Sequence, residues 1–312
     1  MMKIAIVGAG AMGCLYGAKL STTEHEVWLL DVMEAHIDAI NQQGLRVMET
    51  NGEGVEMAFA YTHLKATIRP EEAGPADLAL IFVKSTMTRQ AIMHNKPVFG
   101  PNTVILTLQN GLGNIESIQQ IESQTDIIAG TTAHGASMIS PGVIRHSGVG
   151  KTIIGELSGD LSSRIVNLAG IFNSADLSTE VSRNVIGLIW DKLLVNVGIN
   201  ALTAITGLKN GGLLANRHTE ELLELAVSEA QKVGLAKGIT FNFTDPVAHA
   251  KEICLATAEN TSSMLQDIKN QRRTEIDQIN GAIVREGKLL NIDTPVNQVL
   301  YNLVKIKEAD YE

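Results

Sequence analysis

The stretch KIAIVGAGAMG, from Lys3 to Gly13, joins an apolar run to three glycines spaced Gly8-x-Gly10-x-x-Gly13. The apolar run predicts a strand, and MGCLYGAKLS, which follows, has the spacing of a helix. In such a strand–turn–helix, Gly8 permits the tight turn and Gly10 lets the backbone approach a pyrophosphate. Gly13 lets the helix pack close to the strand. The alternative is a glycine-rich turn with a purely structural role.

The helix start in this loop offers free N–H groups that attract phosphates. We therefore predict a dinucleotide-binding loop. Its residues are Gly8, Gly10, Ala11, Met12 and Gly13.

A second apolar run, EVWLLD, ends in Asp31, 18 residues beyond Gly13. At this position a carboxylate accepts hydrogen bonds from the adenosine ribose of NAD, unless the aspartate simply ends the strand. The same carboxylate would repel the 2′-phosphate of NADP, and Val32 and Met33 bring no positive charge. Lys84, after the run LALIFV, is placed to contact a phosphate, which would weaken this discrimination. We expect NAD, with NADP the less favoured cofactor.

Residues 1–180 alternate between short apolar runs and helical patterns. Continuous apolar runs are typical of parallel strands covered on both faces. The alternation predicts an α/β fold, a Rossmann doubly wound sheet that binds the dinucleotide. The expected strands after the first two are LALIFVK, NTVILTLQNG and DIIAGTTAHG, with weaker candidates in GVIRHSG and KTIIGEL.

Residues 181–312 change character and predict an all-helical domain for substrate binding and dimerisation. The expected helices include SRNVIGLIWDKLLVNVGINALTAI, TEELLELAVSEAQKVGLAKG ending at Gly238, SSMLQDIKNQ and TEIDQINGAIVREGKLL. In DTPVNQVLYNLVKIKE, Thr294 as N-cap and Pro295 as first helical residue mark a helix start. The apolar helix faces exceed what one small bundle needs, which favours a homodimer.

The composition narrows the function further. A net charge of −9 argues against nucleic acid or anionic lipid as partners. The two cysteines, Cys14 and Cys254, provide neither a disulfide framework nor a zinc motif, so no metal is expected, and Cys14 is interpreted as a packing residue. Neither a signal peptide nor an apolar span of membrane length is evident. We expect a cytoplasmic protein without a membrane partner.

Two polar features stand out among the apolar segments. In IWDKLLVNVGIN, Lys192, Asn196 and Asn200 are four residues apart and share one helix face. Such a lysine is suited to donate a proton to a carbonyl oxygen, although snorkelling from an amphipathic helix is the simpler alternative. Asn110 lies at an Asn-Gly turn after a strand, where it either meets the ligand or only forms the turn. His134, in GTTAHGAS, has no acid nearby in the sequence and is interpreted as structural.

The glycine loop, LQNGLG, WDKLLVNVGINALTAI and SSMLQDIKNQRRTEIDQINGAI together resemble the ketopantoate reductase family over essentially the full length. The resemblance implies a Rossmann domain, a helical domain, and a substrate cleft between them. Members reduce a 2-keto acid to a D-2-hydroxy acid with a nicotinamide cofactor.

The resemblance also implies roles for individual residues. The family's catalytic lysine matches Lys192 and its glutamate matches Glu275. We expect Glu275 in the first turn of a helix, close to Lys192, with the alternative that it only complements the helix dipole. The substrate-binding residues match Asn196, Asn210 and Ser263, although Ser263 has the alternative role of a helix N-cap. Asn110 matches an asparagine near the nicotinamide, in contact with cofactor and substrate.

Asp31 departs from the NADPH-using members, which carry a basic residue near the end of the second strand. It resembles the NAD-dependent D-2-hydroxyacid or D-mandelate dehydrogenase branch, so we expect NADH-dependent reduction of a C3-branched 2-keto acid. The first alternative is an NADPH-dependent 2-dehydropantoate 2-reductase, in pantothenate synthesis. Further alternatives are a 3-hydroxyisobutyrate-type dehydrogenase, whose second-domain glycine signature is not found, and a non-catalytic NAD-sensing protein.

Overall fold

The computed structural model describes residues 1–50, 55–122 and 126–311. The chain forms two compact units. The first comprises Met1–Gln109 and Asn114–Val185, and the second comprises Asn110–Gly113 and Ile186–Glu312. A piece of the first half of the chain, Asn110–Gly113, therefore belongs to the second unit.

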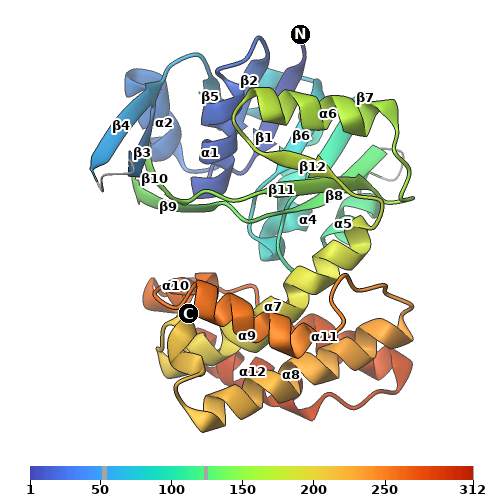
Figure 1. Cartoon of the computed structure of the whole chain (residues 1–312). Coiled ribbons are helices and arrows are strands. Elements are labelled where there is room, and N and C mark those ends of the chain that lie inside the picture. Colours follow the sequence, from blue (N-terminus) through green and yellow to red (C-terminus); the bar gives the residue numbers. More distant parts are fainter. Residues whose placement is uncertain (51–54, 123–125, 312) are drawn as a thin grey trace. The chain divides into compact units, whose positions relative to one another are not determined.

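The first unit is built on an eight-stranded sheet with the order β12-β11-β8-β7-β6-β1-β2-β5 (Figure 1). The six strands from β5 to β8 are parallel and follow the Rossmann order, whereas β11 runs antiparallel to β8. The strands are β1 (Lys3–Val7), β2 (Glu26–Leu30), β5 (Lys65–Thr67), β6 (Ala76–Ile81), β7 (Phe99–Thr107), β8 (Asp126–Thr132), β11 (Thr152–Glu156) and β12 (Thr179–Val181).

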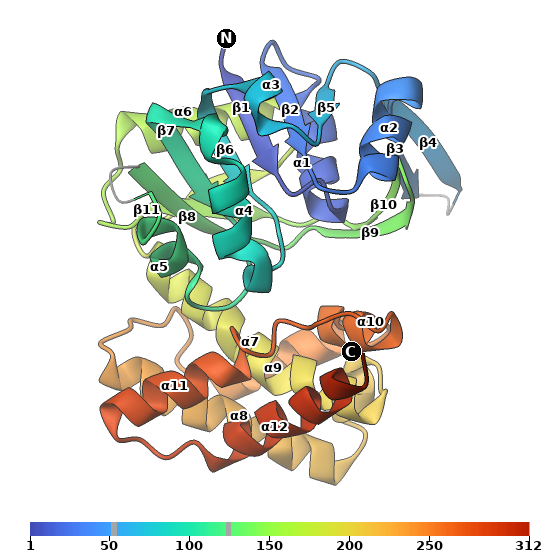
Figure 2. The same cartoon turned by 180° about the vertical axis from the view of Figure 1, so that it is seen from behind.

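Helices cover both faces of this sheet, as Figures 1 and 2 show from opposite sides. One face packs on α1 (Ala11–Leu20), α2 (Glu34–Gln43) and α6 (Ser163–Ser174). The other face packs on α3 (Pro70–Ala73), α4 (Thr88–His94) and α5 (Asn114–Gln119), with short 3-10 turns η1 (Ser85–Met87) and η2 (Lys96–Val98) between them. Because both faces are covered, the central strands are continuous apolar runs, and the predicted doubly wound sheet is confirmed.

A second, four-stranded sheet in the same unit has the order β4-β3-β10-β9. Its strands are β3 (Leu45–Thr50), β4 (Glu56–Tyr61), β9 (Gly135–Ser140) and β10 (Val143–Gly148). Of these, only β10 is predicted from its sequence. The side chains of β4 are largely exposed, so this strand lacks the apolar run that marks a buried strand.

The second unit contains no strand within its described residues. Its helices are α7 (Val185–Thr206), η3 (Asn210–Leu213), α8 (Arg217–Ala236), α9 (Pro246–Ala256), α10 (Ser263–Lys269), α11 (Asn280–Leu290), α12 (Pro295–Glu308) and η4 (Ala309–Tyr311). Helix α7 is long and apolar enough to cross a membrane, but two thirds of its most apolar window (67%) is buried inside the protein. It contributes Trp190, Leu194 and Val197 to the apolar core of this unit, and Trp190 lies against Gly234 of α8.

The predicted start of α12, with Thr294 as N-cap and Pro295 as first helical residue, is confirmed, whereas that of α11 is not. Thr294 is the N-cap of α12, but its side chain forms no capping bond, because the Glu229 carboxylate accepts the N–H groups of Val296 and Asn297 instead. Helix α11 begins at Asn280 rather than near Thr274. Ile279 has a non-helical backbone that separates α11 from the preceding turn, so Glu275 lies in that turn and not in a helix.

Candidate active site

The glycine loop has the geometry that its spacing predicts. Gly8 has φ +97° and donates its N–H to Leu30 O at 2.8 Å. A Cβ on Gly13 would lie 2.0 Å from the carbonyl oxygen of Gly8, so only glycine lets α1 start so close to β1. A Cβ on Gly10 would meet nothing within 4 Å, so open space lies beside the N-terminus of α1. Free N–H groups at a helix start beside open space fit a pyrophosphate.

Asp31 stands at the same edge of the sheet, directly after β2. Its Oδ1 accepts the N–H groups of Val32 at 2.8 Å and Met33 at 3.0 Å. Within the described part of the chain, no protein donor is recorded for the second carboxylate oxygen, which fits a ribose hydroxyl. Lys84 is exposed and follows Val83, which is the residue that a Cβ on Gly8 would touch.

A polar cluster lies in the second unit. The Asn110 amide donates to Glu275 Oε2 at 3.4 Å, and the Leu112 N–H donates to Gln278 O at 2.9 Å. The Asn-Gly turn is thereby fixed against the turn that carries Glu275, whose side chain is buried. Gly111 has φ +80°, and a Cβ there would lie 2.5 Å from Gln278 O, which explains the glycine.

Lys192 belongs to the same cluster. Burial lowers the pKa of its ammonium to about 8, and the Glu275 carboxylate partly opposes this shift. A lysine of this kind changes protonation near neutral pH, which suits proton transfer. Along α7, Lys192 and Asn196 are partly exposed, whereas Asn200 is buried. The polar stripe of the sequence therefore enters the core at Asn200.

Two other predicted substrate residues lie in the second unit. Asn210 donates to Thr257 Oγ1 at 2.9 Å, while its own Oδ1 is buried and has no partner among the described residues. Ser263 is exposed. The N-cap of α10 is Ser262, whose Oγ accepts the Leu265 N–H at 3.1 Å, so the alternative N-cap role of Ser263 is excluded.

Some interactions around these groups are not evident from the sequence. The Glu308 carboxylate accepts both the N–H of Thr274 at 2.7 Å and its hydroxyl at 2.6 Å, next to Glu275. His134 lies 3.2 Å from His146, which in turn lies 3.3 Å from the Glu49 carboxylate. The acid associated with His134 is thus remote in sequence, which is why the sequence does not reveal it.

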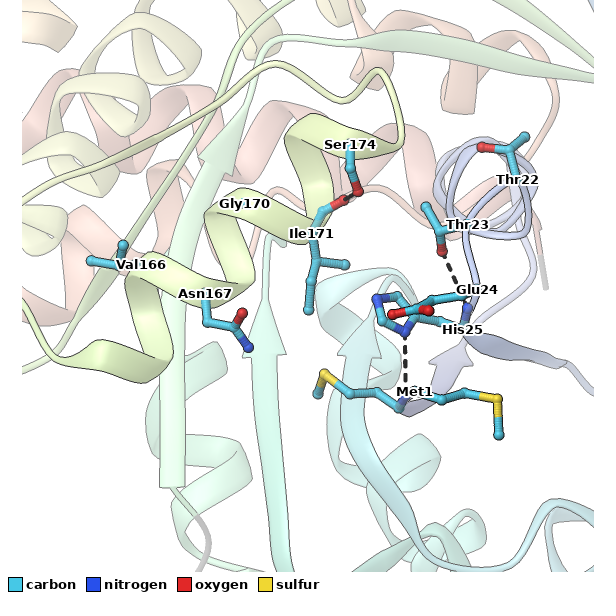
Figure 3. Close-up of a pocket in the computed structure, with 11 residues that line it drawn as sticks. Met1, Thr22, Thr23, Glu24, His25, Val166, Asn167, Gly170, Ile171 and Ser174 are labelled. Atoms are coloured by element: carbon cyan, nitrogen blue, oxygen red, sulfur yellow. Dashed lines mark hydrogen bonds between the residues drawn. The ribbon is translucent and has the colours of Figure 1, made fainter.

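Other possible sites in the described residues carry less chemistry. A surface depression lies between the start of β1, the α1–β2 connection and α6, and is lined by Met2, His25, Asn167 and other residues (Figure 3). It lies at the amino ends of β1 and β2, whereas ligands of doubly wound sheets bind at the carboxyl ends. In residues 1–50, 55–122 and 126–311, no group of three or more His, Cys, Asp or Glu is arranged to hold a metal.

The sheet with its glycine loop and acid, together with the desolvated lysine of the helical unit, defines the class of a two-domain, dinucleotide-dependent oxidoreductase. Comparison with known proteins identifies the family. The model of the ketopantoate reductase PanE/ApbA family matches residues 4–159, and that of its C-terminal domain matches residues 184–308. The chain belongs to the ketopantoate reductase family.

Relatives and solved structures agree over the full length. The 2-dehydropantoate 2-reductase of Pyrococcus horikoshii is 38% identical, over 99% of this chain and 98% of its own. That of Halobacterium salinarum is 34% identical, over 99% and 100%. Among solved structures, the chain is similar to a PanE/ApbA family ketopantoate reductase from Ralstonia eutropha, with 35% identity and a TM-score of 0.90. It is also similar to a D-mandelate dehydrogenase in complex with NADH and anilino(oxo)acetate, with 30% identity and a TM-score of 0.90. Each match covers 99% of both chains.

The expected D-mandelate dehydrogenase type is wrong as the main assignment. The curated relatives at 33–38% identity over the full length are 2-dehydropantoate 2-reductases. The error has a physical reason. Asp31 is predicted to meet the adenosine end of the cofactor, and a residue in that position informs on the cofactor and not on the keto acid.

Proposed function

We propose that this protein reduces 2-dehydropantoate to pantoate with a nicotinamide cofactor. The observation that carries the proposal is the cluster of Lys192, Asn110 and the buried Glu275, in which the pKa of Lys192 is lowered to about 8. The cluster occurs in a chain whose full-length relatives are 2-dehydropantoate 2-reductases.

The chemistry requires a proton donor on the protein. When bound, the reduced nicotinamide supplies a hydride to C2 of the keto acid. Negative charge then develops on the ketone oxygen, and the Lys192 ammonium stabilises it and donates the proton. Glu275 raises the pKa of Lys192 and so keeps more of the lysine protonated. Asn110 holds the Glu275 carboxylate through its amide.

The remaining polar residues of the second unit bind the substrate in this proposal. Asn196 projects from the open part of the α7 stripe, and Ser263 is exposed at the start of α10. Asn210 brings a buried acceptor without a partner in the described chain, and a hydroxyl such as the one on C4 of 2-dehydropantoate would satisfy it. Each of these assignments rests on the side chain's chemistry together with the family motif.

The cofactor proposed is NADH in preference to NADPH. Gly8, Gly10, Ala11, Met12 and Gly13 bind the pyrophosphate, Lys84 contacts a phosphate, and Asp31 binds the adenosine ribose. Asp31 supports this order because a carboxylate repels a 2′-phosphate. Replacing Asp31 by Asn should remove the repulsion and raise kcat/KM with NADPH at least about tenfold. If the ratio of kcat/KM with NADH to kcat/KM with NADPH is the same in this variant as in the wild type, the role of Asp31 is refuted.

We also propose a homodimer formed through the helical unit, in the cytoplasm. Exposed apolar side chains on α12, such as Val299, Leu303 and Ile306, support the association. The oligomeric state is measured by light scattering of the purified protein, and a monomer at all concentrations contradicts the proposal.

The function is tested by following oxidation of NADH with 2-dehydropantoate and identifying pantoate as the product. Lys192→Ala should lower kcat by at least about a hundredfold, since a general acid contributes roughly 10² to 10⁴ in rate. Lys209→Ala serves as the control, because Lys209 is an exposed lysine of the same unit that pairs with Glu259. Near-normal turnover by Lys192→Ala would overturn the assignment.

A further inference from the structure

Cys14 and His36 form a buried hydrogen-bonded chain behind the glycine loop. Both side chains are almost completely buried, Cys14 at 0% and His36 at 1% exposure. The Cys14 thiol donates to the carbonyl oxygen of Ala9 at 3.1 Å, and His36 Nε2 lies 3.3 Å from the same sulfur. The N–H of Gly142 donates to His36 Nδ1 at 3.0 Å.

The hydrogen bonds of this series can all form at once, because each group donates toward the next, from Gly142 to Ala9. Since His36 Nδ1 accepts from Gly142, the neutral imidazole carries its proton on Nε2 and directs it toward the Cys14 sulfur and the carbonyl oxygen of Ala9. The thiol is then free to donate to Ala9 O. Burial lowers the pKa of His36 and raises that of Cys14, so both groups stay uncharged at neutral pH, as this arrangement requires.

The series of hydrogen bonds ends at the peptide group between Ala9 and Gly10, which lies in the predicted pyrophosphate-binding loop. Ala9 O belongs to the same peptide as the N–H of Gly10, and in a trans peptide these two bonds point in opposite directions. The thiol bond to Ala9 O therefore turns the Gly10 N–H away from Cys14. Gly10 is the N-cap of α1 and borders open space, which is where a pyrophosphate is expected.

The residues of this series of hydrogen bonds come from three elements of the first unit. Cys14 lies in α1, His36 lies in α2 and Gly142 lies in the turn between β9 and β10. Gly142 has φ +73°, and a Cβ there would lie 3.0 Å from Ala39 Cβ, so the turn is held against α2. The turn that supplies the Gly142 N–H is thus held by packing against α2.

We infer that Cys14 and His36 are positioning residues that orient the Ala9–Gly10 peptide for binding of the dinucleotide pyrophosphate. The inference rests on the proposed function only in that the cofactor is a dinucleotide. It assigns to Cys14 a role beyond packing, and it links the loop to the small sheet through His36.

The test measures the dissociation constant of NADH by fluorescence titration, without substrate. Cys14→Ala removes the donor and should weaken NADH binding about tenfold, the effect of losing one net hydrogen bond. Cys14→Ser retains an O–H donor and should restore most of the affinity. Cys254→Ala is the matched control, because Cys254 is equally buried but lies in the helical unit, and its affinity should equal that of the wild type.

Further measurements separate positioning from general destabilisation. The KM for 2-dehydropantoate and kcat at saturating NADH should change less than about twofold in Cys14→Ala. His36→Phe keeps an aromatic ring but removes the Nε2–H donor, so it should also weaken NADH binding. The effects of the two substitutions should not be additive in the double variant, since both residues act on the same peptide.

The outcomes distinguish this inference from the proposed function. Equal NADH affinity of the wild type and Cys14→Ala, or failure of Cys14→Ser to differ from Cys14→Ala, overturns the inference alone. If Cys14→Ala fails to fold, His36→Phe decides, and a wild-type NADH affinity of this variant overturns the inference. A folded wild type that binds neither NADH nor NADPH overturns both proposals.

Discussion

The protonation of Lys192 leads to a testable pH profile. With a pKa of about 8, about nine tenths of the lysine carries the proton at pH 7 and about one tenth at pH 9. If the ammonium is the general acid, kcat/KM for reduction of 2-dehydropantoate should fall about tenfold between these pH values. The assay follows NADH at 340 nm, under saturating cofactor, from pH 6 to pH 10.

Glu275→Gln provides the second half of this prediction. Glu275 raises the pKa of Lys192, so its neutral replacement should move the descending limb to lower pH and reduce activity at pH 7 more than at pH 6. Lys209→Ala should keep the wild-type profile. A wild-type profile that is flat from pH 6 to pH 10, or a limb that stays in place in Glu275→Gln, would refute the reasoning.

Three further predictions concern stability and binding. Because the pKa of Lys192 is lowered from 10.5 in the unfolded chain to about 8 in the folded protein, the contribution of Lys192 to stability increases as the pH rises between these values. In urea unfolding, the free energy of unfolding of the wild type relative to Lys192→Met should rise by roughly 3 kcal/mol from pH 7 to pH 11. No rise would contradict the desolvation of Lys192. Gly10→Ala should keep the Tm but weaken NADH binding, because its Cβ would lie in open space. Gly13→Ala should lower the Tm by several degrees, because its Cβ would lie 2.0 Å from the backbone. Equal Tm values for the two variants would contradict this packing. Glu308→Ala leaves the N–H and hydroxyl of Thr274 without their acceptor, so the free energy of unfolding should fall by roughly 2 kcal/mol. We also expect kcat to drop, because Thr274 precedes Glu275. An unchanged kcat would show that this contact does not affect the active site.

The Rossmann sheet was predictable because its information is local. The glycine spacing, the apolar strands and Asp31 all lie within short windows, and the physical causes of their geometry act between near neighbours. The small sheet was not predictable, because β4 is exposed and pairs with β3 without an apolar pattern of its own. In the polar stripe of α7, Lys192 is partly exposed while Asn200 turns into the core, a difference that periodicity alone does not reveal.

Partners distant in sequence account for the other differences. The capping of α12 by Glu229 and the anchoring of Thr274 by Glu308 join residues dozens of positions apart. Ser262 rather than Ser263 is the N-cap of α10, a difference of one residue that a pair of serines cannot resolve. The expectation of a D-mandelate dehydrogenase type was wrong because it rested on Asp31, which is predicted to contact the cofactor and not the keto acid.

The assignment of Asn110–Gly113 to the helical unit constrains how such chains are recombined. A chimera that joins residues 1–185 of one family member to the helical half of another would combine an asparagine turn and a glutamate turn from different parents. The bonds from Asn110 to Glu275 and from Leu112 to Gln278 would then depend on two sequences that did not evolve together. An exchange of the helical half between two such chains therefore keeps these bonds within one parent only if the four residues Asn110–Gly113 are exchanged with it.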